Sequence, residues 1–326
     1  MEQTFLESEW PEDEPAVNSR PDRRRVLRSR PVRVAGILTM VGALAMGAIC
    51  WSASTRAIHP AEHGYAWSLA TYPDLHGRDV RFASRTGIQI QGRLFAGSKP
   101  AVIVLSHGYG DTQDQLLPFA HFLHQAGFSV LTYNMRSRGG SGGSAVSLGA
   151  LEQTDLVSAV DFLDAQPETR GEPTGAWGIS LGGATSILAA AQDSRIKAVV
   201  DDSGFSDAPN VIQSAFSHFI HLPAFPFAPL TVGLSEERIG VSITDVRPMD
   251  VIGKISPRPI LMIHCLGDVL VPPDNTERNL SHAGEPKEVW WIPGGYHANG
   301  HTIAKAEYEQ RVSEFFEKSL LPGGKN

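Results

Sequence analysis

The sequence predicts an α/β fold: a mostly parallel sheet with an N-terminal antiparallel hairpin, helices on both faces and a small cap insertion. From residue 101 onward, short apolar runs alternate with helix-type segments, which is the pattern of parallel strands joined by crossover helices. Before them, strand-type runs at residues 80–84 and 88–95 flank a short turn, which indicates a hairpin at one edge of the sheet. Between residues 205 and 251 the alternation stops, and an aromatic, proline-broken segment predicts the cap.

The later strands are predicted where the chain is apolar and partly β-branched, as expected for strands that are buried on both faces. They cover residues 101–105, 128–134, 174–178, 196–200, 258–265 and 288–292. The predicted helices cover residues 113–125, 151–165, 181–192 and 302–318. Because binding and catalytic loops gather at the carboxyl ends of parallel strands, we expect any chemistry in the loops that follow these strands.

Residues 178–182 read Gly-Ile-Ser-Leu-Gly and stand between a predicted strand and a predicted helix. A strand that turns into a helix within one residue holds the serine in strained backbone geometry, so the flanking positions need glycine. This context makes Ser180 the candidate nucleophile of a serine hydrolase. The alternative is a glycine and serine turn without chemical consequence.

A serine hydroxyl is a weak nucleophile until a base takes its proton, so a histidine and an orienting carboxylate should follow downstream. Asp268 lies in the loop after the predicted strand 258–265, and His297 lies in the glycine-rich loop after the strand 288–292. Both loops belong to the same edge of the sheet. We therefore expect Asp268 to orient His297, and His297 to act as the base for Ser180.

Other interpretations of these residues stay open from the sequence. Asp268 follows Gly267 in a dipeptide that turns favour, and His297 could be a loop histidine without a partner. Some enzymes of this design carry the carboxylate one strand earlier, which would make Asp202 or Asp201 the acid.

The predicted strand 101–105 runs into the sequence His-Gly-Tyr-Gly at residues 107–110. Backbone N–H groups that point at a developing oxyanion stabilise the transition state of acyl transfer. By the geometry of such sites, we expect the two donors in this chain to be the N–H of Tyr109 and the N–H of Leu181, the residue after the nucleophile. The phenol of Tyr109 could also polarise a carbonyl. His107 suits a structural hydrogen bond within the loop, although it is a second candidate base.

The motifs lie at residues 107–110, 134–143, 178–183, 268–272 and 294–297. Together they resemble the α/β-hydrolase superfamily over residues 79–321, and within it the bacterial membrane-anchored Bem46-like and serine aminopeptidase-like hydrolases. The resemblance implies the α/β-hydrolase fold and a Ser-His-Asp mechanism that needs no cofactor. One loop departs from the family pattern: Asn134 and the run Arg136-Ser137-Arg138-Gly139 stand where an aspartate and R-G-x-G-x-S are usual.

The start of the chain predicts a membrane anchor. Residues 1–33 carry a block of acids and then seven arginines between residues 20 and 33, so we expect a disordered leader. Residues 34–53 contain no charge, and about 30 Å of helix is enough to cross a bilayer. The positive-inside rule places the leader in the cytoplasm and the hydrolase outside it, with residues 54–78 as a connector. Alternatives are a signal peptide cut near residues 52–54, which would give a secreted protein, and a buried core helix.

The net charge of −7 and the placement of the charges bear on partners. Arginines beside a membrane span favour anionic lipid rather than nucleic acid, and the predicted catalytic domain is acidic. Cys50 lies in the predicted anchor and Cys265 ends a strand, so no disulfide is expected. His297 and His301 have the spacing of two ligands on a helix, but Asn299-Gly300 between them indicates a loop, and no metal site is expected.

These residues predict a carboxylic-ester hydrolase, of the carboxylesterase or lipase type, that acts on a small ester or a lipophilic acyl substrate. A peptidase or amidase of the same fold shares every motif and is the first alternative. A membrane-tethered binding protein on an inactive scaffold is the alternative from another class, although it requires none of Ser180, Asp268 and His297. An apolar cap favours a lipophilic substrate group, unless its phenylalanines only pack against the body. The sequence leaves the oligomeric state open.

Overall fold

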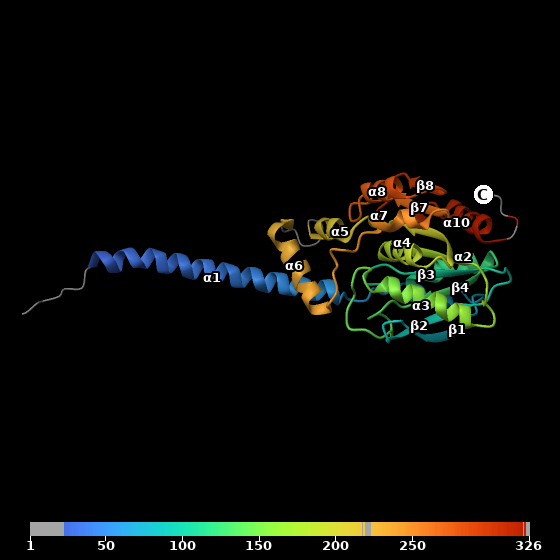
Figure 1. The fold of residues 1–326 in the computed structure, drawn as a ribbon, viewed down its shortest axis with the longest axis horizontal. Coiled ribbons are helices and arrows are strands. Elements are labelled where there is room, and N and C mark those ends of the chain that lie inside the picture. Colours follow the sequence, from blue (N-terminus) through green and yellow to red (C-terminus); the bar gives the residue numbers. More distant parts are fainter. Residues whose placement is uncertain (1–22, 217, 219–222, 322, 324–326) are drawn as a thin grey trace, which may run out of the picture. The chain divides into compact units, whose positions relative to one another are not determined.

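The computed structural model describes residues 23–216, 218, 223–321 and 323, with side chains from residue 31 onward. The chain divides into two units, Met1–Ala48 and Ile49–Asn326. The second unit contains an eight-stranded sheet with the order β1-β2-β4-β3-β5-β6-β7-β8 (Figure 1). Its strands are β1 (Arg78–Ala83), β2 (Gln89–Phe95), β3 (Val102–Ser106), β4 (Ser129–Tyr133), β5 (Thr174–Ile179), β6 (Ile196–Asp202), β7 (Ile260–Cys265) and β8 (Lys287–Ile292).

The pairing of these strands matches the predicted fold class. β1 pairs with β2, and β2 with β4, in antiparallel register, whereas the neighbours from β4 to β8 pair in parallel. Every residue of β3, β4, β5 and β7 is buried, as the apolar composition of these runs predicts. The mostly parallel sheet with an N-terminal hairpin is therefore confirmed.

Helices cover both faces of the sheet, because successive residues of a strand point to opposite sides. In β3, Val104 packs in the core below α3 and α4, and Ile103 packs in a second core below α2 and α10. The helices are α2 (Leu117–Gln125), α3 (Glu152–Ala165), α4 (Leu181–Gln192), α5 (Ala208–Ala215), α6 (Ala224–Ile239), α7 (Pro248–Val251), α8 (Asp274–His282), α9 (Gly300–Ile303) and α10 (Lys305–Leu320). Short 3-10 turns are η1 (Leu69–Thr71), η2 (Gln113–Leu116) and η4 (Ile252–Ile255).

Two helical regions differ from the sequence prediction. α8 lies between β7 and β8, where no helix is expected from the sequence, because its Asp, Asn, Thr and Ser residues are weak helix formers. The predicted helix 302–318 is divided into α9 and α10, since Ala304 has non-helical backbone angles of φ −123° and ψ 44°. Neither difference moves the ends of the strands that carry the candidate site.

The predicted cap insertion 205–251 contains α5 and α6, and its residues 217 and 219–222 lie outside the described residues. Farther along the same stretch, α7 and η4 pack on α4 and α8. This end of the insertion therefore belongs to the body of the domain.

The helix α1 (Arg23–Ile58) begins in the first unit and ends in the second. Its stretch Pro31–Ile58 is long and apolar enough to cross a membrane, with a mean hydropathy of 2.0. It extends beyond both ends of the predicted anchor 34–53. Of the leader expected to be disordered, residues 1–22 lie outside the described residues, and the remainder is helical, in keeping with the helix propensity of Arg and Leu.

The predicted connector 54–78 is part of the second unit and is hydrogen-bonded to two of its loops. The N–H of His63 donates to the carbonyl of Gly110 at 3.1 Å. The guanidinium of Arg138 donates to the carbonyl of Pro60 at 2.7 Å. The connector therefore lies against the loops that follow β3 and β4.

Candidate active site

The turn between β5 and α4 holds Ser180 in a strained backbone conformation. Its φ of 57° and ψ of −116° lie in a region that residues other than glycine rarely adopt. The flanking glycines leave no space for a side chain: a Cβ on Gly178 would collide with the carbonyl oxygen of Gly182, and one on Gly182 with that of Ser106. The N–H of Ser180 donates to the carbonyl of Asp202 at 2.7 Å. The local sequence thus folds into a sharp turn with the serine at the carboxyl edge of the sheet.

Ser180, His297 and Asp268 form a continuous hydrogen-bonded chain. The Oγ of Ser180 lies 2.8 Å from Nε2 of His297, and Nδ1 of the same ring lies 2.7 Å from Oδ2 of Asp268. An ionised carboxylate can only accept, so Nδ1 carries the ring hydrogen and Nε2 accepts from the Ser180 hydroxyl. Three loops of the sheet edge therefore bring these side chains into the arrangement that a nucleophile, a base and its orienting acid require.

The folded chain stabilises the ionised form of Asp268. Burial by itself raises the pKa of this carboxyl, but hydrogen bonds with His264 and His297 lower it to about 2. Its Oδ1 accepts from the N–H groups of Leu270 and Val271 at 3.0 Å and 2.9 Å. The carboxylate is therefore charged and fully bonded at neutral pH.

His264 contacts Asp268 and was not among the candidate site residues from the sequence. Its Nε2 lies 2.8 Å from the carbonyl oxygen of Val271 and 3.4 Å from Oδ2 of Asp268. A carbonyl can only accept, so this nitrogen carries a hydrogen. Burial alone lowers the pKa of His264, but its hydrogen bonds with Asp268 and Val271 raise it above the usual value. The sequence signal that could have identified it is a lone histidine inside an apolar strand, one loop before the acid.

Asp202, the alternative acid, is bonded to other side chains. It accepts from the hydroxyl of Tyr308 at 2.6 Å and from that of Ser203 at 2.8 Å. Burial raises the pKa of its carboxyl. Asp268 is hydrogen-bonded to His297, whereas Asp202 is not.

Asp201, the other alternative, is a buried carboxyl whose charge the fold disfavours. Its Oδ1 accepts from the N–H of Gly204 at 3.0 Å, and its Oδ2 has no partner among the described residues. Burial raises its pKa to about 7, although nearby His264 acts in the opposite direction. Asp201 thus faces the helix that begins after Ser180 and has no contact with His297.

The predicted oxyanion donors stand at the ends of two neighbouring strands. Ser106 of β3 pairs with Gly178 of β5, so the loop that contains Tyr109 begins beside the turn that leads to Leu181. Within the described residues, neither the N–H of Tyr109 nor that of Leu181 donates a hydrogen bond. Leu181 is the first residue of α4, and unpaired N–H groups at a helix N-terminus favour negative charge. Both N–H groups therefore remain without a partner within the described residues.

His107 has the structural role that the sequence indicates. Its Nε2 accepts from the N–H of Met135 at 2.9 Å, so its Nδ1 carries the hydrogen and donates to the carbonyl of Gly108 at 2.8 Å. Burial lowers its pKa to about 4. The imidazole is therefore neutral and already bonded through both nitrogens.

The suggestion that the phenol of Tyr109 polarises a substrate carbonyl is wrong. Its hydroxyl donates to the carbonyls of Arg56 and Ala57, at 3.1 Å and 2.8 Å, in the last turn of α1. Burial raises the pKa of this phenol to about 12. The side chain therefore fastens the loop after β3 to the end of α1.

The loop that departs from the family pattern is fixed by its own side chains. The amide of Asn134 accepts from the N–H of Gln113 at 2.7 Å and donates to the carbonyl of Gly139 at 2.9 Å. Arg136 donates twice to the buried carboxylate of Asp155, at 2.8 Å and 2.7 Å. The same loop is bonded to the connector, since Arg138 donates to the carbonyl of Pro60 and the N–H of Gly139 donates to Glu62 at 2.8 Å.

A cluster of three or more His, Cys, Asp or Glu side chains that could hold a metal ion is absent from the part of the chain that the structure describes. His301, the partner considered for His297, instead bonds to Glu309 at 3.0 Å and packs its ring against Phe119. The contacts of His301 are those of a residue that joins α9 to α10.

Known proteins are similar to this chain in sequence or in architecture. Residues 54–219 match the X-Pro dipeptidyl-peptidase (S15) family. The uncharacterised protein YqkD of Bacillus subtilis is 30% identical over 237 residues, which cover 72% of this chain and 77% of that protein. The esterase Pf2001 of Pyrococcus furiosus has a TM-score of 0.67 at 19% identity and covers 80% of this chain and 99% of its own. An acylaminoacyl peptidase of Pyrococcus horikoshii has a TM-score of 0.56 at 21% identity, over 80% of this chain and 45% of its own.

The two structural likenesses, at 19% and 21% identity, show a shared fold. The match to the X-Pro dipeptidyl-peptidase (S15) family supports hydrolase activity in general. These similarities leave the choice between ester and peptide substrates open. The narrower similarity to Bem46-like hydrolases stays a prediction. By the family match and the similarity to YqkD, the chain belongs to the X-Pro dipeptidyl-peptidase (S15) family of the α/β-hydrolase superfamily.

Proposed function

We propose that this protein is a membrane-anchored serine hydrolase that cleaves carboxylic esters with Ser180, His297 and Asp268 as its catalytic triad. The observation that supports this proposal most directly is the unbroken chain of two hydrogen bonds, 2.8 Å and 2.7 Å long, from the serine hydroxyl to the carboxylate. A buried carboxyl with a pKa of about 2 is charged throughout the physiological range and can stabilise the imidazolium that forms on His297.

The reaction follows from the protonation states of these groups. Nε2 of His297 removes the hydroxyl proton as Ser180 Oγ bonds to the carbonyl carbon of the ester, and the carbonyl oxygen becomes an oxyanion. The N–H groups of Tyr109 and Leu181 donate to that oxyanion. His297 then gives its proton to the departing alcohol, which leaves an acyl-serine. A water molecule, deprotonated by the same nitrogen, hydrolyses the acyl-serine and restores Ser180.

We place the hydrolase unit outside the cytoplasmic membrane, with α1 as an uncleaved anchor. The apolar stretch Pro31–Ile58 supports the anchor, and the arginines that precede it support this orientation. The alternative cleavage near residues 52–54 would cut through packed structure. Cys50 and Ser54 are buried in the second unit, and Ser54 accepts from Arg238 at 3.1 Å, so removal of the preceding turn would expose part of α6.

A peptidase or amidase of the same fold is the second candidate. It is favoured by the match to the X-Pro dipeptidyl-peptidase (S15) family and by the likeness to an acylaminoacyl peptidase. The triad chemistry is the same for both, because His297 can protonate an amine as it does an alcohol. The distinction therefore depends on which leaving groups are turned over.

The test uses the full chain in detergent micelles with a panel of p-nitrophenyl esters of rising acyl length, beside aminoacyl p-nitroanilides. We expect ester turnover, labelling by a fluorophosphonate probe, and loss of both in Ser180→Ala. Ser281→Ala, which changes an exposed serine on α8, is the matched control and should behave as wild type. Turnover of the anilides in preference to every ester would assign the protein to the peptidases.

Two results would reject the proposal outright. Ester hydrolysis that survives in Ser180→Ala would remove the assigned nucleophile. A wild-type protein that neither reacts with the probe nor hydrolyses any ester or anilide would favour a tethered binding protein on an inactive scaffold.

A further inference from the structure

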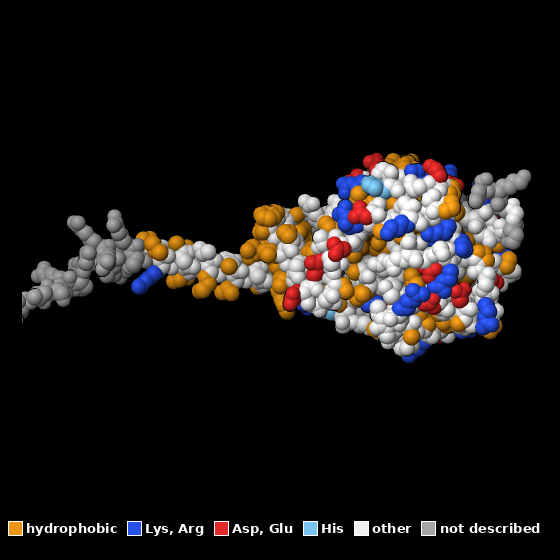
Figure 2. Space-filling model, viewed as in Figure 1, with side chains coloured by type: hydrophobic (Ala, Val, Ile, Leu, Met, Phe, Trp, Pro, Cys, Tyr) orange, Lys and Arg blue, Asp and Glu red, His pale blue; other side chains and the backbone are white. Residues whose placement is uncertain are grey.

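The helix α6 presents apolar side chains to solvent instead of to a core. Phe225 is 82% exposed and Leu230 is 44% exposed, the former being the most exposed large apolar side chain of the described part of the chain. Figure 2 shows hydrophobic side chains gathered at the end of the body where α6 lies. From Ala224 to Leu234 the helix carries no charge, and its charged residues, Glu236 among them, follow at its C-terminal end. Exposed apolar surface of this kind marks a site of interaction with another molecule or with a membrane.

The position of α6 is fixed by the end of α1 that belongs to the same unit. Ser235 donates to the hydroxyl of Ser54 at 3.0 Å, and Arg238 donates to Ser54 and Thr55 at 3.1 Å and 2.9 Å. The guanidinium of Arg238 also lies 4.6 Å from the ring centroid of Trp51. Trp51 is 55% exposed, and an aromatic ring with a cation beside it is typical of the membrane–water boundary. The residues that hold α6 in place therefore belong to the C-terminal part of the apolar stretch Pro31–Ile58.

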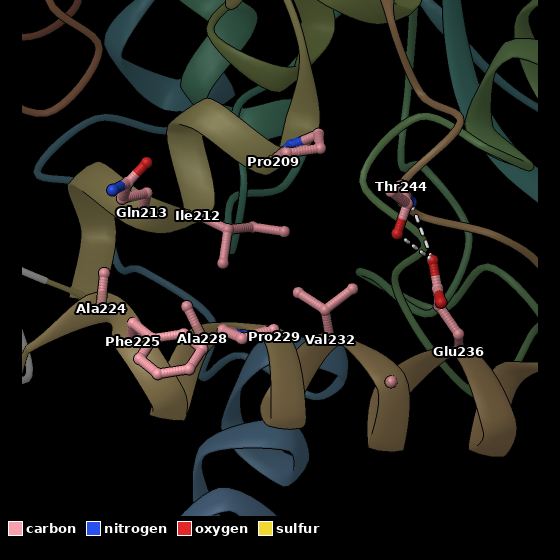
Figure 3. Close-up of a pocket in the computed structure, with 11 residues that line it drawn as sticks. Pro209, Ile212, Gln213, Ala224, Phe225, Ala228, Pro229, Val232, Glu236 and Thr244 are labelled. Carbon is pink, nitrogen blue, oxygen red and sulfur yellow. Dashed lines mark hydrogen bonds between the residues drawn. The ribbon is translucent and has the colours of Figure 1, made fainter.

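Between α5 and α6 there is a hollow of about 400 Å³, within the usual range of pockets for small ligands. Ile212 from α5 and Val232 from α6 point toward each other across it, and Phe225 lies at one end (Figure 3). The lining is mostly apolar, and its polar residues are Gln213, Glu236 and Thr244. An aliphatic chain suits such a lining better than a polar ligand does.

The one carboxylate in this lining is bonded to the protein. Glu236 accepts from the N–H of Ile243 at 2.8 Å and from the N–H and hydroxyl of Thr244 at 2.8 Å and 2.7 Å. Burial alone raises its pKa, but these hydrogen bonds lower it, so the group is ionised and directed at its own loop. It therefore forms a polar end to the hollow and does not compete for an apolar occupant.

The hollow is also close in the chain to the candidate catalytic edge. β6 ends at Asp202, whose carbonyl accepts from the N–H of Ser180, and α5 begins soon after it. The side chain of Asp207 caps α5 by accepting from the N–H of Asn210 at 2.9 Å. The helix α5, which forms one wall of the hollow, thus belongs to the segment that follows β6 and the candidate site.

The geometry points to a lipid-binding cap: α6 contacts the bilayer through Phe225 and Leu230, and the hollow between α5 and α6 takes the acyl chain of a membrane lipid ester. This inference rests on the proposed function, because it names a membrane-resident acyl ester as the substrate class of the same site. Lipid would supply the apolar surroundings that the described residues do not provide for these two side chains. A substrate ester held in the bilayer would then enter the protein through the cap and not from bulk water.

The first test measures hydrolysis by the full chain reconstituted in phosphatidylcholine liposomes. p-Nitrophenyl palmitate is held in the bilayer, whereas p-nitrophenyl acetate is delivered from water. We expect Phe225→Asp and Leu230→Asp to lower the ratio of palmitate hydrolysis to acetate hydrolysis at least tenfold. Phe225→Leu should retain palmitate hydrolysis, and Ser281→Asp, which adds the same charge on α8, should leave both rates unchanged. Equal effects on both esters, or an unchanged palmitate rate, would overturn the inference.

The second test does not depend on hydrolysis, so it separates failure of this inference from failure of the proposed function. A phosphatidylcholine with a diazirine at the end of one acyl chain is photolysed in the same liposomes, and the labelled peptides are identified by mass spectrometry. We expect label within residues 209–236 as well as in α1, and its loss from 209–236 in Phe225→Asp. Lipid label confined to α1 would assign the exposed face of α6 to something other than lipid. The same conclusion would follow if Phe225→Asp changed the protein from dimer to monomer and left the lipid labelling unchanged. Resistance of the protein to carbonate extraction would report only on the anchor α1, so it is not used as a test of the cap.

Discussion

The candidate catalytic edge and the α5–α6 cap differ in where their side chains find partners. At the edge, the buried Asp268 accepts hydrogen bonds from two backbone N–H groups and from His297, all within the folded chain. On α6, Phe225 is 82% exposed and Leu230 is 44% exposed, so the described residues leave both side chains open to solvent. The polar groups at the candidate catalytic edge thus find their partners within the folded chain, whereas the exposed surface of the cap is stabilised only by apolar surroundings.

This difference separates two kinds of function. A triad requires side chains held within a fraction of an ångström, and burial with complete hydrogen bonding supplies that rigidity. A surface that receives a lipophilic substrate needs exposure instead, so it cannot be stabilised by the same packing. Substitutions at the edge should therefore change chemistry or stability, whereas those on the cap should change neither in water.

The largest effect is expected for Asp268→Asn. The amide would donate to Nδ1 of His297 and force the hydrogen onto Nε2, which could then no longer accept the proton of Ser180. We expect kcat for a soluble ester to fall by about 10³- to 10⁴-fold, since the loss of tautomer control has an effect of that order in serine hydrolases. Melting temperature and ester kinetics of the full chain in detergent would measure it.

Asp202→Asn is the matched control for the assignment of the acid. Asp202 bonds to Tyr308 and Ser203, and an amide oxygen can still accept from one of those hydroxyls. We expect its kcat to stay within about tenfold of wild type. If Asp202→Asn is the variant that loses activity and Asp268→Asn is not, the carboxylate of the triad comes from the earlier strand.

A smaller effect, on stability, is expected for Asp201→Asn. The pKa of Asp201 is raised to about 7 in the folded protein, mainly by burial, so the native state keeps a proton that the unfolded chain has released above pH 4 or so. The contribution to stability is therefore full in acid and is lost as pH rises toward 7, by roughly 2 to 4 kcal/mol. Asp201→Asn should thus flatten the decrease in melting temperature between pH 5 and pH 8. Asp250→Asn, at an exposed position, is the control; an equal slope in wild type and Asp201→Asn would contradict the prediction.

For His264→Gln we expect a loss of about tenfold in kcat, smaller than for Asp268→Asn because the bonds from Leu270, Val271 and His297 to the carboxylate remain. A residue that only stabilises the fold would lower melting temperature without affecting the pH profile. Since His264 helps to keep the pKa of Asp268 low, its removal should also raise the pH at which protonation of that carboxyl begins to lower the melting temperature. A melting-temperature profile parallel to that of the wild type at low pH would make His264 a purely structural residue.

The sequence predicts the strands, their order of appearance and the main candidate residues, because each of these leaves a local signal. Ser180 stands in a glycine-flanked turn, and the strands before Asp268 and His297 are apolar runs with clear ends. The contact of His264 with Asp268 and the bond from the Tyr109 phenol to Ala57 could not be predicted, since both depend on which groups meet after folding. α8 was missed because its polar composition gives little helix signal, although packing against the body supports it.

The smallest effect is expected for Phe225→Ala, and it tests the cap side of the comparison. Because Phe225 is 82% exposed, its truncation removes little buried surface, and the free energy of unfolding in detergent should change by less than about 0.5 kcal/mol. The matched variant is Phe205→Ala, since Phe205 is 2% exposed and its truncation in the core should cost about 3 to 5 kcal/mol. Melting temperatures of the two variants should therefore differ by roughly 5 to 15 °C. Comparable destabilisation by both would mean that Phe225 packs within the protein, and the cap would then be a part of the core that needs no lipid.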